Sequence, residues 1–74
     1  MHARPAGAFA KVASEFKSAI EIKANGMSKN GKSIMGLMSL GLVKDSEIIL
    51  TANGEDAEAA LIKLELLVQN KFQL

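Results

Sequence analysis

Apolar residues near the start of the chain recur at steps of three and four. They are Phe9, Val12, Ala13 and Phe16. This spacing is typical of an amphipathic helix, and it predicts one that begins within a residue or two of His2. Pro5 then falls in the first turn, where a missing backbone N–H costs little because the first N–H groups have no partner within a helix.

A hairpin pattern follows this helix. Residues 19–24 read AIEIKA, in which isoleucine alternates with charged residues, the period of a strand with one buried face. The next two residues, Asn-Gly, predict a tight turn. Residues 27–29 predict a second strand that runs back, and a further Asn-Gly step closes it.

The segment KSIMGLMSLG, residues 32–41, predicts a short helix of about two turns. Ser33 suits the N-cap position of this helix, and Gly41 suits the position just after its C-terminal end. Ile34, Met35 and Met38 cannot all point inward, because adjacent helical positions are about 100° apart. We therefore expect some of them to form an exposed apolar patch, which in a small domain suggests a docking surface, although Met and Ile on a short helix are often core residues.

Residues 46–52, SEIILTA, predict a third strand, and their apolar character favours a central place in the sheet. The last helix follows a third Asn-Gly step. Its apolar stripe comprises Ala57, Ala60, Leu61, Leu64, Leu67 and Val68. Ile62 and Leu66 lie opposite that stripe and are expected to face water. The order helix, strand, strand, short helix, strand, helix predicts an α+β fold with an antiparallel sheet and the helices on one face.

Composition narrows the functional classes. The chain has 74 residues, no Cys, one His, no Trp or Tyr, and a net charge of +1. It is expected to form one small domain over residues 1–74. Without Cys the chain cannot form a disulfide. One His and no Cys leave too few ligands for a typical structural zinc site, and no cofactor is expected. Neither nucleic-acid binding nor membrane insertion is expected, because there is no basic field and no long apolar run. A soluble, cytoplasmic protein fits these features best.

The single histidine lies where the first helix is expected to begin. Unpaired N–H groups and the helix dipole make such a position favourable for an anion. An imidazole there is biased toward its neutral, nucleophilic form, and Arg4 adds a fixed positive charge. Lys11, Lys17, Lys32 and Lys44 are either ordinary solvated charges or a basic rim for acidic partners.

Two segments in this order, HARPAG at residues 2–7 and KSIMGLMSLG at residues 32–41, resemble the histidine-containing phosphocarrier protein HPr of the bacterial phosphoenolpyruvate:sugar phosphotransferase system. The resemblance implies an open-faced β-sandwich. It also implies that His2 accepts a phosphoryl group from enzyme I and passes it to sugar-specific IIA domains, with Arg4 as its charge partner. The protein would then be a substrate of enzymes and not itself an enzyme.

The same resemblance implies regulatory phosphorylation of Ser33 by an HPr kinase/phosphorylase, and contact with a catabolite-control regulator. It places partner contacts at Ala3, Gly7, Ile34, Met35 and Met38. Members of the family carry a strand and a loop before the histidine, whereas Met1 alone precedes it here. The resemblance therefore implies a sheet that lacks its first edge strand.

Two alternatives stay open. A regulatory or interaction module on the same scaffold would act through Ser33 and the apolar patch alone, and a small oligomerising domain is a weaker option. The exposed sheet edge, together with Ile62 and Leu66, predicts a homodimer, because exposed strand edges recruit other chains. Isolated surface apolar residues are, however, common in monomers.

Overall fold

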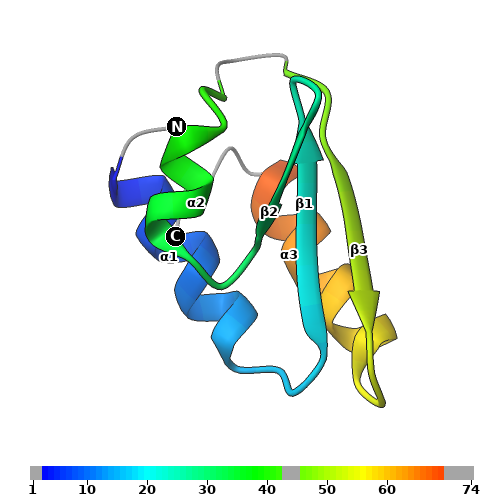
Figure 1. Cartoon of the computed structure of the whole chain (residues 1–74). Helices are drawn as coiled ribbons and strands as arrows, with labels where there is room; N and C mark the ends of the chain where they lie inside the picture. Colours follow the sequence, from blue (N-terminus) through cyan, green and yellow to red (C-terminus); the bar gives the residue numbers. More distant parts are fainter. Residues whose placement is uncertain (1–2, 43–45, 70–74) are drawn as a thin grey trace.

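The structure, a computed structural model, describes residues 3–42 and 46–69. Its elements are α1 (Ala3–Ser14), β1 (Ala19–Ala24), β2 (Met27–Asn30), α2 (Ile34–Ser39), β3 (Ile49–Asn53) and α3 (Ala57–Gln69). The strands form one antiparallel sheet in the order β2-β1-β3. The three helices lie on one side of this sheet (Figure 1). The predicted α+β open-faced sandwich and the predicted order of elements are confirmed.

The central strand β1 shows why the sequence AIEIKA forms a two-faced strand. Ile20 and Ile22 are buried beneath the helices, whereas Lys23 on the opposite face is exposed. The register places Glu21 opposite Thr51 of β3 and opposite Asn30 of β2. One face of the sheet is therefore apolar and covered, and the other is open and largely polar, as the period of two requires.

Helix α1 buries one stripe against the rest of the molecule. Its buried positions are Ala6, Phe9, Ala10, Val12 and Ala13. Phe9 is fully buried and belongs to the same core as Ile22, Leu37 and Leu64. The opposite side of α1 faces solvent, so packing fixes which residues of the first turn remain accessible.

Helix α3 is also amphipathic. Leu64 and Leu67 are buried, whereas the side chains of Ile62 and Leu66 are 56% and 53% exposed. The expectation that these two residues face water is confirmed.

Strand β3 differs from the prediction in two ways. It begins at Ile49 and not at residue 46, and it lies at an edge of the three-stranded sheet, with β1 in the centre. The prediction of a central place is therefore wrong for the described residues. Three consecutive apolar residues, 48–50, cannot all face the helices, because strand side chains alternate. Ile49 accordingly points to the open face and is 62% exposed.

The loop between α1 and β1 is joined to the start of α3 by a carboxylate. Asp56 accepts hydrogen bonds from the backbone N–H groups of Lys17 (2.8 Å) and Ser18 (2.9 Å) and from the Ser18 hydroxyl. The backbone of Gly54 passes so close that an added Cβ would lie 2.7 Å from Ser18 Cα. Only glycine fits there. We call this group of three residues, Ser18, Gly54 and Asp56, the Asp56 clamp.

Candidate functional site

The first turn of α1 lies where the sequence predicts the helix to begin, and it carries Arg4. The helix begins at Ala3, directly after His2, and contains no acidic residue in its first turn. Arg4 is exposed there. His2 itself lies outside the described residues. The unpaired N–H groups of a 12-residue helix and the Arg4 guanidinium together make this end of α1 favourable for an anion.

The residues that follow anchor the turn without filling the space around it. Pro5 is half-buried and Ala6 is fully buried, so the turn is fixed to the core. Gly7 is half-buried, and a Cβ built on it would meet no atom within 4 Å. The surface beside Gly7 is therefore open enough for another molecule to approach the backbone.

Ser33 is the N-cap of α2, as predicted. Its backbone is extended (φ −105°, ψ 115°), and its Oγ accepts a hydrogen bond from Gly36 N at 3.0 Å. The hydroxyl thus satisfies one of the N–H groups that a helix start leaves unpaired. Ser33 is half-buried, and a modifying enzyme would have to compete with this hydrogen bond for its oxygen.

Helix α2 exposes a group of apolar side chains. Ile34 is 44% exposed, Met35 78% and Met38 40%. Leu37 and Leu40 point the other way and are buried. We call Ile34, Met35 and Met38 the α2 patch. The expectation that these residues form an exposed surface is confirmed, and a core role for them is wrong.

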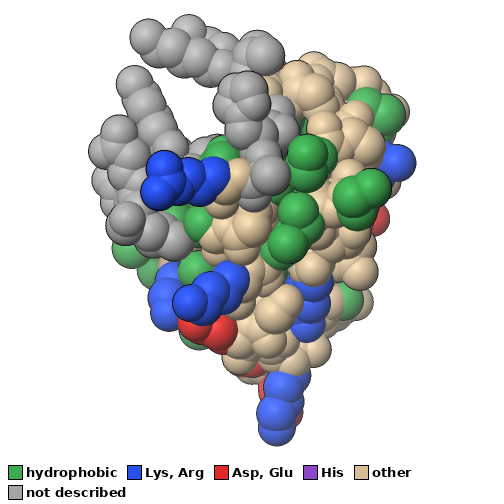
Figure 2. All heavy atoms as spheres, turned by 90° about the vertical axis from the view of Figure 1, so that its left-hand side faces the viewer, with side chains coloured by type: hydrophobic (Ala, Val, Ile, Leu, Met, Phe, Trp, Pro, Cys, Tyr) green, Lys and Arg blue, Asp and Glu red, His purple; other side chains and the backbone are tan. Residues whose placement is uncertain are grey.

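The α2 patch and the start of α1 lie on the same side of the molecule. Helices α1 and α2 pack against each other (Figure 1). On this side, hydrophobic side chains gather in one area, with Lys and Arg side chains around it and few acidic ones (Figure 2). The surface therefore suits a partner with an apolar centre and acidic surroundings.

The four lysines considered for a basic rim have different surroundings. Lys11 is exposed. Lys17 Nζ lies 3.9 Å from Glu55 Oε1, a solvent-exposed ion pair. Lys32 is half-buried and its Nζ donates to Phe16 O at 2.7 Å, close to the end of α1. Lys44 lies outside the described residues. Lys32 therefore also joins the α1–β1 loop to the segment between β2 and α2 through this hydrogen bond.

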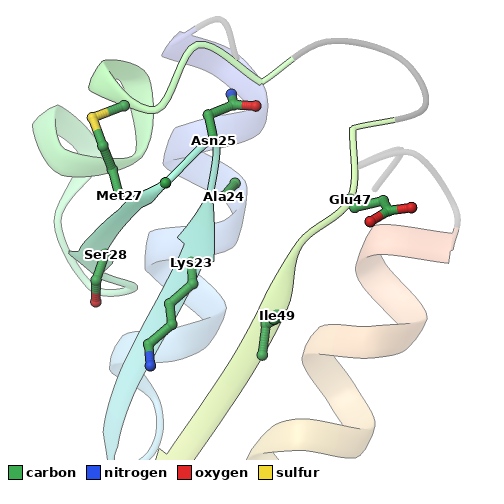
Figure 3. Close-up of a pocket in the computed structure, with 8 residues that line it drawn as sticks. Lys23, Ala24, Asn25, Met27, Ser28, Glu47 and Ile49 are labelled. Carbon is green, nitrogen blue, oxygen red and sulfur yellow. The ribbon is translucent and has the colours of Figure 1, made fainter.

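A shallow depression of about 580 Å³ lies at the β1–β2 turn (Figure 3). It is lined by Lys23, Ala24, Asn25, Gly26, Met27, Ser28, Glu47 and Ile49. None of the residues predicted for the site is among them. The described residues contain no group of His, Cys, Asp or Glu side chains arranged to hold a metal ion, and none of their helices is long and apolar enough to cross a membrane.

One exposed apolar residue at the edge of this depression was not predicted to be exposed from the sequence. Met27 is 39% exposed, and its side chain extends from β2 toward α2 (Figure 3). Met27 precedes three polar residues in a four-residue strand, and a short hairpin strand of this kind signals an edge with accessible side chains.

Comparison with known proteins shows the class to which this fold belongs, the small phosphocarrier proteins. A family model described as the PTS HPr component phosphorylation site matches residues 1–70. The chain therefore belongs to the HPr family of the bacterial phosphotransferase system.

Solved structures agree with this assignment. The chain is 42% identical to HPr from Thermoanaerobacter tengcongensis, crystallised as a dimer, over 100% of this chain and 85% of that one, with a TM-score of 0.91. It is 44% identical to the catabolite repression protein Crh of Bacillus subtilis, over 95% and 80% of the two chains (TM-score 0.90). It is 46% identical to a phosphocarrier HPr from Bacillus anthracis, over 85% and 75% (TM-score 0.82).

Proposed function

We propose that this protein carries a phosphoryl group on His2, taking it from phosphorylated enzyme I and passing it to sugar-specific IIA domains. One observation carries the proposal. The chain belongs to a family defined by a phosphorylation site, and it contains a single histidine, directly before α1. A phosphohistidine on this chain can therefore only be at residue 2. Residues 1–74 would act as one carrier domain in the cytoplasm.

The surroundings explain how such a carrier works without being an enzyme. A neutral imidazole nitrogen attacks phosphorus, and charge builds on the oxygens of the transferring group. The unpaired N–H groups of α1 and the Arg4 guanidinium stabilise that charge. The carrier supplies the nucleophile and these donors, and the partner supplies the rest of the catalytic centre. Transfer is reversible because the N–P bond is reactive.

Incubation with enzyme I and phosphoenolpyruvate tests the proposal. We expect one acid-labile phosphate on the native protein, measured by intact mass, and none on His2→Ala. Arg4→Ala should transfer about tenfold to a hundredfold more slowly, because one transition-state donor is lost. Arg4→Lys should recover only part of the rate, since an ammonium ion lacks the planar fork of a guanidinium.

Lys23→Ala is the matched control for Arg4, because it also removes one positive charge but lies on the open face of the sheet. Labelling of His2→Ala at the native level would refute the assignment of the acceptor. Equal rates for Arg4→Ala and Lys23→Ala would leave Arg4 without a specific role.

Partner binding is assigned to the surface made by Ala3, Gly7 and the α2 patch. The open space beside Gly7 and the exposure of Ile34, Met35 and Met38 support this assignment. We assign enzyme I to this surface as the donor. An HPr kinase/phosphorylase and a catabolite-control regulator are further proposed partners, which act at Ser33.

Ser33 is proposed as a regulatory phosphorylation site. Its hydroxyl caps α2 beside the α2 patch, so a phosphate there would add negative charge next to the docking surface. We expect Ser33→Asp to bind enzyme I several-fold more weakly than Ser33→Asn, at low salt, where charge is least screened. Both replacements can cap a helix, so the comparison isolates the charge. Equal dissociation constants for these two variants would contradict the proposal.

A second candidate function is a regulatory module that does not transfer phosphate to IIA domains. The likeness to Crh, described as a catabolite repression protein, favours it. The two candidates differ at one step. A carrier whose phosphohistidine form labels IIA domains satisfies the first proposal, whereas a protein that binds regulators through Ser33 but is not labelled by enzyme I satisfies the second.

Self-association belongs to the same proposal. The HPr of Thermoanaerobacter tengcongensis and Crh of Bacillus subtilis both have dimeric structures, the Crh dimer by domain swapping. In this chain, the outer edge of β3 pairs with no strand in residues 3–42 and 46–69. We infer that two copies pair along this edge.

A further inference from the structure

The α2 patch contains methionine side chains, whose sulfur atoms can be oxidised. The chain has no Cys, Trp or Tyr but has four Met residues. Three of them lie in the described part of the chain, and all three have exposed side chains: Met27 (39%), Met35 (78%) and Met38 (40%). With no thiol to react first, the thioether sulfurs are the main targets for an oxidant in this protein.

We propose that Met35 is a reversible oxidation site, and that its sulfoxide weakens docking of the phosphoryl donor. This inference rests on the proposed function, because the donor is the partner assigned to the α2 patch. Met35 is the most exposed of the described methionines, and on α2 it follows Ile34 directly and precedes Met38 by three positions, about one helical turn. An oxidant in solution therefore reaches its sulfur more readily than those of Met27 and Met38.

Hydrogen peroxide can oxidise the Met35 thioether to the sulfoxide without a further reactant. The Met35 sulfur takes one oxygen atom, the O–O bond breaks, and hydrogen peroxide is reduced to water while the thioether becomes a sulfoxide. A methionine sulfoxide reductase reverses the step. It returns the thioether and releases the oxygen as water, while two thiols become a disulfide.

The modification changes the surface and leaves the fold intact. Met35 contributes little to the core, because α2 is anchored by the buried side chains of Leu37 and Leu40. A sulfoxide is strongly polar, and burying it against a partner without a hydrogen bond is unfavourable. We expect about tenfold weaker docking, which corresponds to about 1.4 kcal/mol.

Two double variants provide the test. The first, M27L/M38L, keeps Met35 and the second, M35L/M38L, keeps Met27. Both retain Met1, so any effect of that residue is common to the two. Each protein is treated with hydrogen peroxide, its oxidised residues are located by peptide mass, and its labelling by enzyme I is compared with the same protein before treatment. Urea unfolding is measured in parallel.

We expect the oxidised M27L/M38L protein to lose about tenfold in kcat/KM through a higher KM, with an unchanged urea midpoint and recovery after reductase treatment. The oxidised M35L/M38L protein should change less than about twofold. Equal losses in both proteins, or oxidation of Met35 with unchanged KM, would overturn the inference alone. Absence of labelling before treatment would overturn the proposed function, and this inference with it.

Discussion

At the scale of single residues, the Asp56 clamp is the clearest case of a side chain that sets stability. The pKa of Asp56 is lowered from 3.8 to about 2, first by the hydrogen bond from the Ser18 hydroxyl and then by the backbone N–H of Lys17, with partial burial acting in the opposite direction. The folded state therefore favours the carboxylate more than the unfolded state does.

This shift predicts an acid-sensitive contribution to folding. Because the folded pKa is the lower one, the contribution is complete above the unfolded value of 3.8 and is lost as the pH falls toward about 2. We expect Asp56→Asn to have a lower urea midpoint than the native protein at neutral pH. The two midpoints should converge as the pH is lowered across this range.

Glu21 also makes the stability of the folded state depend on pH in the acid range, so Asp56→Asn should not remove this dependence completely. The pKa of Glu21 is also lowered, mainly by a hydrogen bond from Ser28, with Lys23 and Thr51 helping and desolvation opposing. Some acid sensitivity should therefore remain in Asp56→Asn. A constant difference between native and variant midpoints from neutral pH to about pH 2 would contradict the assigned role of Asp56.

At the scale of elements, α2 depends on its contacts with the rest of the molecule. It has only six residues, and an isolated helix of that length is not stable in water. Leu37 is fully buried and Leu40 nearly so. The helix therefore forms because these two side chains pack beneath it, and the α2 patch is displayed on its other side as a consequence.

This dependence predicts that two alanine substitutions on α2 change the free energy of unfolding by very different amounts. Leu37→Ala should lower the free energy of unfolding by about 2–5 kcal/mol, because it leaves a cavity in the core. Met35→Ala, at a position that is 78% exposed, should change it by less than about 0.5 kcal/mol. Urea denaturation of the two variants measures both values. A similar loss in both would show that Met35 stabilises α2 as much as Leu37 does, contrary to this prediction.

At the scale of the whole molecule, the open edge of β3 bears on the oligomeric state. An unpaired strand edge presents N–H and C=O groups that can pair with another chain. Ile49 lies on this strand with a 62% exposed side chain. A small domain with such an edge gains stability by pairing it.

We therefore expect a dimer at micromolar concentration, measured by sedimentation. Ile49→Lys should shift it toward monomer, because a charged residue on an edge strand opposes pairing. Ile62→Lys is the matched control, since it makes the same change at an exposed position on α3. Disruption by Ile62→Lys alone would place the interface on α3. A native protein that is monomeric and folds cooperatively would refute the dimer.

Much of the fold could be predicted because it depends on local patterns. The alternation in residues 19–24 predicts β1, the Ser33 cap and the spacing after it predict α2, and the wheel position of Ile62 predicts its exposure. In each case the signal lies within a few residues of the position it describes. The same holds for Arg4, whose place in the first turn follows from where α1 begins.

Other features depend on residues far apart in the chain. Asp56 and Ser18 are separated by 38 positions, and Lys32 and Phe16 by 16. No local pattern marks either pair. The order of strands is likewise a result of packing, because the helices cover one face and apolar content alone cannot tell an edge strand from a central one.

The amino-acid sequence by itself determined the elements, the capping of α2 by Ser33, and His2 and Arg4 as candidates, because each of these follows from local periodicity, dipole and composition. Ser33 became a candidate for phosphorylation only through the resemblance of the two segments to the HPr family. Only the tertiary structure decided that β1 is central, that the loop before β1 is fixed to α3 through Asp56, and that Met27 is exposed beside α2. The physical reason is that these features depend on which distant segments pack together, and that choice is made by the folded core as a whole.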